Sequence, residues 1–289
     1  FLLALFEIEL EVLNDGEIPQ THGHMVHGHF FKILKQIAPD LCNRIHGMNG
    51  TLPFTLSTLY KCGAHPGIHT PEAEKGKRVC YRAGLLNDEL VTAVSLAINK
   101  AMITGPVVIA DIPFGIKAIR LLKGEEIHEL KRYAAVAADR LRTFEINFRT
   151  LSCFRSEGRS LLFPETRLVI SSLYRSWTAA GGHEIPDETL RRIARNVFPA
   201  RYSLRTGMLD MGKYLLSGFV GYCSYEVDEC LDRDERSALL SLLGMIPYAG
   251  IGYKTTMGMG QARYRIVPVK DPYDGVDEVA DQASTDGSL

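Results

Sequence analysis

Residues 250–260 read Gly-Ile-Gly-Tyr-Lys-Thr-Thr-Met-Gly-Met-Gly, so that Gly250, Gly252, Gly258 and Gly260 surround Lys254. Glycine lets backbone N–H groups approach a phosphate without obstruction by Cβ, and the lysine adds positive charge. The stretch lacks the P-loop pattern and the third glycine of a dinucleotide fingerprint. It also follows a predicted helix and precedes a predicted strand, which is the reverse of both motifs. ATP and NAD are therefore not expected ligands; a phosphate-binding loop and an ordinary flexible connection both remain open.

The elements around this glycine loop predict one complete folding unit. A strand is expected at residues 143–151, followed by helices at 165–179 and 186–197. Two strands at 201–210 and 213–227 flank a tight turn at 211–212, and a helix at 233–243 leads into the loop. Residues 263–267 form the closing strand. The order is β-α-β-β-α-β with one inserted helix, which is typical of a ferredoxin-like domain.

The N-terminal half repeats this order. Alternating apolar residues at 2–12 predict a strand, and a helix over 22–38 ends before Pro39. Further strands are expected at 54–60, 78–85, 107–110 and 115–122, with a helix at 87–102. We therefore predict an α+β protein with two tandem ferredoxin-like (RRM-like) domains. Their bounds are 1–123 and 143–270, with a connection at 124–142 and an acidic, disordered tail at 271–289.

Composition restricts the class of protein. The net charge is -1, but the tail holds six acidic residues and no Lys or Arg. Outside the tail, 33 basic residues face 28 acidic ones, and a body with this charge of +5 permits RNA binding. No apolar run is long enough for a membrane span. The six cysteines include no C-x-x-C pair, so we expect reduced, packed thiols in a cytoplasmic protein.

The glycine loop resembles the form G-x-G-x-K-(T/S)-x-x-G-x-G of the CRISPR-associated endoribonucleases that process precursor CRISPR RNA. Weaker resemblances occur in the same order as in that family: Ile45-His46 before Pro53-Phe-Thr-Leu-Ser57, then Phe163-Pro164, and then a helix ending in Trp177. The resemblance spans about residues 20–268. It implies repeat RNA and precursor CRISPR RNA as partners, a CRISPR effector complex or a homodimer as further ones, and no cofactor, metal or membrane.

Five of the nine histidines lie between residues 22 and 46, which at first suggests a metal site. At 100° per residue, however, His22 and His29 lie at the edge of the apolar stripe of the predicted helix. His24 and His27 lie on the opposite side with Phe31 and Lys35. Histidines on different faces of one helix cannot converge on one zinc ion, although a metal site formed by His24 and His27 with ligands elsewhere in the chain remains open. The polar side instead suits base stacking by Phe31 and phosphate contacts by Lys35.

The resemblance implies that His46 is the catalytic histidine, with His27 or His24 as its partner. The family often places a tyrosine where this chain has Phe31, and a lysine where it has Thr51-Leu52-Pro53. Phe31 has no hydroxyl, so any proton-transfer role of the tyrosine must fall to another residue. The missing lysine leaves the stabilisation of the transition-state charge unassigned. Four residues are candidates for that role and for RNA binding: Lys35, Arg44, Arg175 and Lys254. The basic hairpin resembles one that grips the base of a repeat stem, through Arg201, Arg205 and Lys213.

RNA carries its own nucleophile, the 2′-hydroxyl, so two histidines suffice for both proton transfers without a metal. The expected products are a 2′,3′-cyclic phosphate and a 5′-hydroxyl. Three other readings remain open: a family member that binds repeat RNA without cutting it, a structural ferredoxin-like subunit of a CRISPR interference complex, and a metal-dependent phosphohydrolase.

Overall fold

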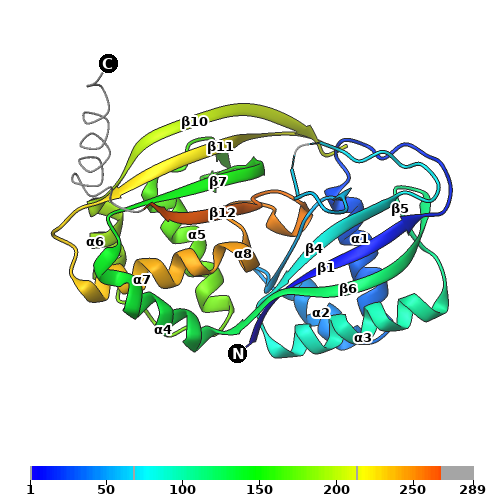
Figure 1. Cartoon of the computed structure of the whole chain (residues 1–289), viewed down its shortest axis with the longest axis horizontal. Helices are drawn as coiled ribbons and strands as arrows, with labels where there is room; N and C mark the ends of the chain where they lie inside the picture. The colour runs from blue at the N-terminus through cyan, green and yellow to red at the C-terminus, as the bar shows by residue number, and fades with distance from the viewer. Residues whose placement is uncertain (1, 68, 213, 268–289) are drawn as a thin grey trace, which may run out of the picture.

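The computed structural model describes residues 2–67, 69–212 and 214–267 (Figure 1). Lys213 and the predicted acidic tail lie outside these ranges. Two α/β units lie side by side along the long axis of the molecule, each with a sheet covered by helices on one face. Within the described ranges, no helix is long and apolar enough to cross a membrane.

The N-terminal unit has the predicted ferredoxin-like order. Its sheet runs β2-β4-β1-β6-β5, and neighbouring strands are antiparallel. The elements are β1 (Leu2–Val12), α1 (Gly23–Lys35), α2 (Pro39–Gly47), β2 (Phe54–Leu56), β3 (Tyr60–Lys61), β4 (Arg78–Leu85), α3 (Asp88–Thr104), β5 (Val107–Ile109) and β6 (Ile112–Glu126).

Alternation along β1 separates a core face from a charged face. Phe6, Ile8 and Leu10 belong to the core of this unit, whereas Glu7 and Glu9 lie on the opposite face. The predicted apolar stripe of α1 packs into the same core. Burial of these side chains holds the first helix against the sheet.

As predicted, the helix α1 ends before Pro39, but Pro39 itself is helical. It occupies the first turn of α2, a second helix that the sequence pattern did not indicate. Proline is favoured at that position because the first N–H of a helix has no intrahelical partner. The short α2 therefore turns back against α1 and carries Arg44 and His46 in its last turn.

The C-terminal unit repeats the order. After α4 (Ile127–Ala137), its sheet runs β10-β11-β7-β12. The elements are β7 (Thr143–Ser152), a small β8–β9 ribbon (Phe154–Ser156 and Arg159–Leu161), α5 (Thr166–Ala179), α6 (Asp187–Asn196), β10 (Val197–Asp210), β11 (Leu215–Val227), α7 (Arg233–Gly244), α8 (Ile246–Ala249), η2 (Thr255–Met257) and β12 (Ala262–Val267). The fold is therefore α+β with two tandem ferredoxin-like domains, as predicted.

The two units meet where α8 and the glycine loop contact β2 and β4. A Cβ on Gly84 would lie 1.9 Å from the carbonyl oxygen of Tyr248, so only glycine permits this approach. The Thr55 hydroxyl donates to the same oxygen at 2.9 Å. The N–H of Gly258 donates to the carbonyl of Leu56 at 3.1 Å. Close backbone packing thus fixes the glycine loop against the N-terminal unit.

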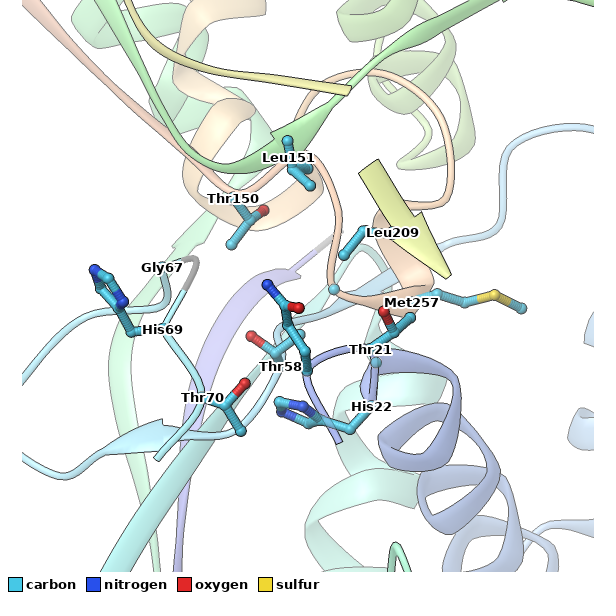
Figure 2. Close-up of a pocket in the computed structure, with 13 residues that line it drawn as sticks. Thr21, His22, Thr58, Gly67, His69, Thr70, Thr150, Leu151, Leu209 and Met257 are labelled. Atoms are coloured by element: carbon cyan, nitrogen blue, oxygen red, sulfur yellow. The ribbon is translucent and has the colours of Figure 1, made fainter. Parts of the chain in front are cut away.

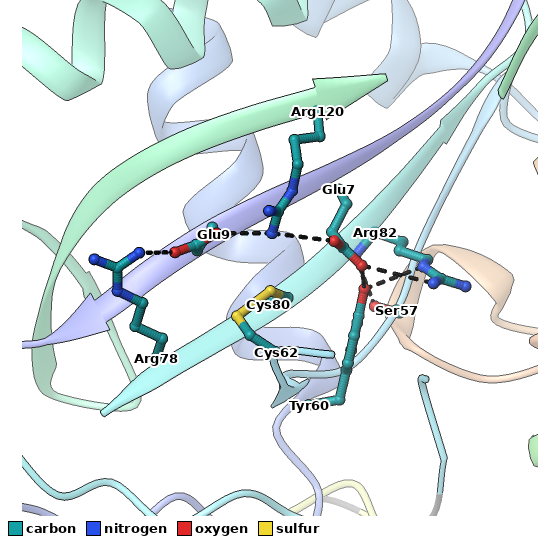
Figure 3. Close-up of a disulfide and its surroundings, with 9 residues drawn as sticks. All are labelled: Glu7, Glu9, Ser57, Tyr60, Cys62, Arg78, Cys80, Arg82 and Arg120. Atoms are coloured by element: carbon teal, nitrogen blue, oxygen red, sulfur yellow. Dashed lines mark hydrogen bonds and ion pairs between the residues drawn. A yellow bond between two sulfur atoms is a disulfide. The ribbon is translucent and has the colours of Figure 1, made fainter. Parts of the chain in front are cut away.

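One cysteine expectation is wrong. Cys62 and Cys80 form a disulfide, with their Cα atoms 5.4 Å apart, on the charged face of the N-terminal sheet (Figure 3). Cys42, Cys153, Cys223 and Cys230 are free. The sequence could not indicate the pair, because β3 brings Cys62 beside β4 only in the folded sheet.

Candidate active site

The structure brings His27, Phe31 and His46 together. His27 and Phe31 are four residues apart on α1, so they lie on one face of the helix with ring centroids 4.9 Å apart. The return of the chain through α2 places the ring of His46 4.4 Å from that of Phe31. Two histidines from different helices therefore flank one phenylalanine.

His27 also contacts the glycine loop. Its Nδ1 lies 3.1 Å from the carbonyl oxygen of Thr256, 229 residues later in the chain. A carbonyl can only accept, so Nδ1 carries the proton and the neutral ring keeps its lone pair on Nε2. Burial has the largest effect on the pKa of His27 and lowers it. The hydrogen bond to Thr256 raises this pKa, whereas the positive charges of His46 and Lys254 lower it further. A neutral imidazole with a free lone pair can accept a proton.

The expected exposure of Phe31 is wrong. Its side chain is only 8% exposed, because α2 covers this face of α1 and the ring packs on His46 and Phe54. It offers no free face for stacking on a base. The Phe31 ring instead packs against the rings of both His27 and His46 and helps to fix their positions.

The other histidines of α1 have different surroundings. His24 makes no ring contact with Phe31 or His46 in the part of the chain that the structure describes, and its buried Nδ1 has no hydrogen-bond partner there. His22 donates from Nδ1 to the carbonyl of Pro19 and accepts at Nε2 from the N–H of Leu59. His29 is 4% exposed. Of the two predicted partners of His46, the geometry therefore favours His27.

His22 borders a narrow pocket between the two domains (Figure 2). Thr21, Thr58 and Thr70 enter it from the N-terminal domain, whereas Thr150, Leu209 and Met257 enter from the C-terminal domain. Its volume of about 60 Å³ has room for ordered water but not for a nucleotide. We regard this pocket as part of the domain interface.

The four glycines of the loop face protein atoms. A Cβ on Gly252 would lie 2.4 Å from the Cys153 carbonyl oxygen, and one on Gly260 would lie 2.2 Å from that of Ile251. Gly250 and Gly258 are similarly crowded, and all four have positive φ. The glycines are therefore required by packing and by backbone conformation within the protein. The expected contact of this loop with RNA phosphate remains a prediction.

Of the four candidates for charge stabilisation, Lys254 lies close enough to His27 for its charge to lower the pKa of that histidine. It adopts a left-handed φ of 57°, which is uncommon outside glycine and asparagine. Arg44 forms an ion pair with Glu89 on α3. Lys35 is exposed at the end of α1, and Arg175 lies on α5 of the other domain, where partial burial lowers its pKa.

The predicted basic hairpin is present. Strands β10 and β11 pair from Val197↔Val227 to Asp210↔Leu215, and Arg201 and Arg205 are exposed on β10. Figure 1 shows this hairpin extending along the molecule toward the N-terminal domain. Lys213, the third predicted contact, lies outside the described residues.

Sequence reasoning missed a cluster of cations between the two sheets. Arg82, Arg149 and Arg263 line a cavity of about 670 Å³ with Lys123. Burial is the main cause of the lowered pKa of Arg263, and the positive charges of Arg149 and Arg82 lower it further. The buried Nε of Arg149 has no hydrogen-bond partner in the described chain. Arg82 lies 3.6 Å from Glu7, but Arg149 and Arg263 have no ion-pair partner among the described residues, and their positive charge suits an anion.

Contacts with Tyr60 and His65 fix the positions of two of these arginines. The guanidinium of Arg82 stacks over the Tyr60 ring and donates to its hydroxyl at 3.0 Å (Figure 3). His65 accepts from Arg263 at 2.8 Å, and burial together with the neighbouring arginines lowers the pKa of His65. The available sequence signal was pairs of arginines an even number of residues apart in the predicted strands: Arg78 and Arg82 on β4, and Arg263 and Arg265 on β12. Such spacing places both arginines of a pair on the same face of the strand.

Among the residues with described positions, no group of three or more His, Cys, Asp or Glu side chains is arranged to hold a metal ion.

Comparisons with known proteins agree on one family. The family model of the CRISPR-associated endoribonuclease Cas6 matches residues 146–262. The Cas6 of Streptococcus thermophilus is 28% identical over 119 residues, which cover 40% of this chain and 48% of that protein. The Cas6 of Mycobacterium tuberculosis strain H37Rv is 25% identical over 211 residues, covering 72% of this chain and 66% of that protein. The matches thus span from about half to two thirds of these relatives.

Solved structures show the same fold. A Thermus thermophilus Cas6 product complex superimposes with a TM-score of 0.75 at 22% identity, covering 91% of this chain and 100% of that chain. A Cas6 bound to a substrate mimic gives a TM-score of 0.68 at 21% identity, covering 91% and 99%. In its family-model match and its sequence relatives, this chain is similar to the CRISPR-associated endoribonucleases Cas6, and the solved Cas6 structures share its fold.

Proposed function

We propose that this protein cuts CRISPR repeat RNA in precursor transcripts without a metal ion. The observation that carries the proposal is the cluster in which His27 and His46 flank Phe31, with Lys254 of the glycine loop close to His27. Two imidazoles and a cation are the groups that cleavage by an RNA 2′-hydroxyl requires.

His27 acts as the general base in this proposal. Its Nε2 takes the proton of the 2′-hydroxyl, and the 2′-oxygen then attacks the neighbouring phosphorus. The bond from phosphorus to the 5′-oxygen breaks, and His46 gives its proton to that oxygen. The products are a 2′,3′-cyclic phosphate and a 5′-hydroxyl. The lowered pKa of His27 favours the neutral form that this role needs.

Lys254 stabilises the additional negative charge on the phosphoryl oxygens. It takes the place of the lysine that the family often carries where this chain has Thr51-Leu52-Pro53. Support for this assignment comes from its position beside His27 and from its unusual backbone conformation. Non-glycine residues held at positive φ are concentrated at functional sites.

RNA is held by two basic surfaces. Arg201 and Arg205 of β10, together with Lys213, contact the backbone of the repeat along the hairpin. The arginines between the two sheets bind phosphates further from the cut site. Binding of this kind depends strongly on salt, because each phosphate contact releases counterions.

Mapping the ends of cleaved repeat RNA in EDTA tests the proposal. We expect one cut that leaves a 5′-hydroxyl and persists without divalent metal. His46→Ala and His27→Ala should each lower the single-turnover rate by about 10²–10⁴-fold and change RNA affinity little. His24→Ala serves as the comparison, because its ring contacts neither Phe31 nor His46 among the described residues. Full activity of His46→Ala would show that His46 is not the residue that protonates the 5′-oxygen.

A second function is a family member that binds repeat RNA without cutting it. The observation in its favour is the absence of both the family tyrosine, replaced by Phe31, and the family lysine near Thr51. The same experiment separates the two functions, since intact RNA that stays bound in EDTA and in Mg²⁺ would support the binding role.

A further inference from the structure

The turn at the centre of the glycine loop lies directly against the first turn of α1. A Cβ added to Gly23 would lie 1.9 Å from the carbonyl oxygen of Met257 and 2.6 Å from its carbonyl carbon. On the other side of the turn, the N–H of Gly258 donates to the Leu56 carbonyl at 3.1 Å. The backbone of the turn is therefore fixed between α1 and β2 of the other domain.

This fixed turn presents the Thr256 carbonyl to His27. Its oxygen lies 3.1 Å from Nδ1. The ring itself is stacked on Phe54, with centroids 5.9 Å apart and planes at 29°, and it contacts Phe31 on α1. The N-terminal domain therefore fixes the orientation of the His27 ring, and the C-terminal domain supplies the carbonyl that accepts the hydrogen bond from Nδ1.

Most other polar groups of the loop are occupied within the protein. The N–H groups of Ile251, Tyr253 and Gly260 donate to the carbonyls of Gly260, Cys153 and Leu151. The N–H of Gly252 donates to the Ser172 hydroxyl at 2.8 Å. These bonds and the crowded glycines make the loop a rigid support for the turn.

We propose that the glycine loop is a positioning element for His27, in which the Thr256 carbonyl holds the proton on Nδ1 and leaves Nε2 free to act on the RNA. The catalytic consequence rests on the proposed function, whereas the tautomer itself does not. A histidine without such a partner divides its proton between the two nitrogens, so only part of the population would have a free Nε2. Thr256 acts through the histidine and does not touch the reacting atoms.

Nitrogen-15 NMR of the histidine side chains tests the tautomer in the unmodified protein. His27→Ala identifies the His27 signals by their loss. At a pH where the ring is neutral, we expect the proton on Nδ1 and a lone pair on Nε2. A neutral His27 that carries its proton on Nε2 would overturn the proposal. Because this measurement uses no RNA, it stands even if the protein proves not to cut RNA.

Two glycine substitutions on the same helix test the role of the loop. Gly23→Ala places a methyl group where the Met257 carbonyl lies, so the turn must move and the Nδ1 bond must lengthen or break. Gly28→Ala adds the same methyl group to α1 at an exposed position with nothing within 4 Å. The difference between the variants isolates the contact with the loop.

For Gly23→Ala we expect a mixture of His27 tautomers, a single-turnover rate at least tenfold lower, and an RNA dissociation constant within twofold of the unmodified protein. Gly28→Ala should keep the tautomer and the rate. Unchanged tautomer and rate in a folded Gly23→Ala would overturn the proposal. If that variant does not fold, the tautomer of the unmodified protein still decides the question.

Discussion

The histidines at the start of α1 differ because of what their ring nitrogens contact. Both nitrogens of His22 are bonded to backbone, which leaves it a structural role. His27 is bonded through one nitrogen only and is partly exposed. His29 is buried, and its Nε2 has no partner in the described part of the chain. The residue type alone would have treated all three as equivalent.

His29 makes the stability of the protein depend on pH. Burial lowers its pKa from 6.5 to about 4, so the unfolded chain binds this proton first as the pH falls. Stability is therefore highest above pH 6.5 and decreases down to about pH 4, by on the order of 3 kcal/mol from this group. His29→Phe should flatten this part of the curve in urea denaturation measured at several pH values. An equally steep curve in the variant would contradict the assignment.

Lys254 should affect chemistry more than binding. Lys254→Met removes the cation beside His27, and we expect a cleavage rate about 10–100-fold lower with a much smaller change in RNA affinity. Lys100→Met, an exposed change on α3, is the matched control and should leave both quantities as they were. An equal loss of affinity and rate in Lys254→Met would mean that this lysine only binds RNA.

At the level of elements, hydrophobic periodicity predicted most of the fold. The strand at residues 2–12, the helix of α3 after Asn87 and the basic hairpin are all present. One element was missed: α1 ends before Pro39 as expected, but Pro39 then begins α2, which the sequence pattern did not indicate. That omission carried over to Phe31, because α2 and Phe54 of β2 cover the face of α1 that the helical wheel showed as polar.

The hairpin of β10 and β11 carries a prediction of its own. Arg201 and Arg205 are exposed on one strand, so replacing both by alanine should remove about two phosphate contacts. RNA affinity should fall about tenfold at low salt, and the slope of log K against log salt should decrease by about 1.5. Arg132→Ala with Arg140→Ala, on α4 and on the helical turn that follows it, provides the control. An unchanged slope would exclude the hairpin from the interface.

At the scale of the whole molecule, the site exists only because two domains meet. His27 and His46 come from the first domain, and Lys254 and the Thr256 carbonyl from the second. The sequence could identify the histidines and the glycine loop separately, through local patterns. It could not indicate their contact, because that depends on close backbone approaches such as Gly84 to Tyr248 and Gly23 to Met257.

The positive charges of the arginines between the two sheets should lower the stability of the free protein and raise its affinity for RNA. Arg149 is held near Arg82 and Arg263, and its buried Nε has no partner among the described residues. Arg149→Met removes this repulsion while keeping much of the side-chain volume. We expect stability to rise by about 1 kcal/mol, or a Tm increase of about 2–4 °C, while RNA affinity falls several-fold.

Arg120→Met is the matched control for that change, because its charge is compensated. Arg120 binds Glu9 at 2.7 Å and Glu7 at 3.4 Å, and both of these acidic residues are buried (Figure 3). Its loss leaves buried acids short of a partner and should lower stability by about 1–3 kcal/mol. Thermal unfolding of the two variants should therefore shift in opposite directions. If Arg149→Met also lowered the Tm, Arg149 would stabilise the domain interface. The prediction that its charge destabilises the free protein and serves RNA binding would then be wrong.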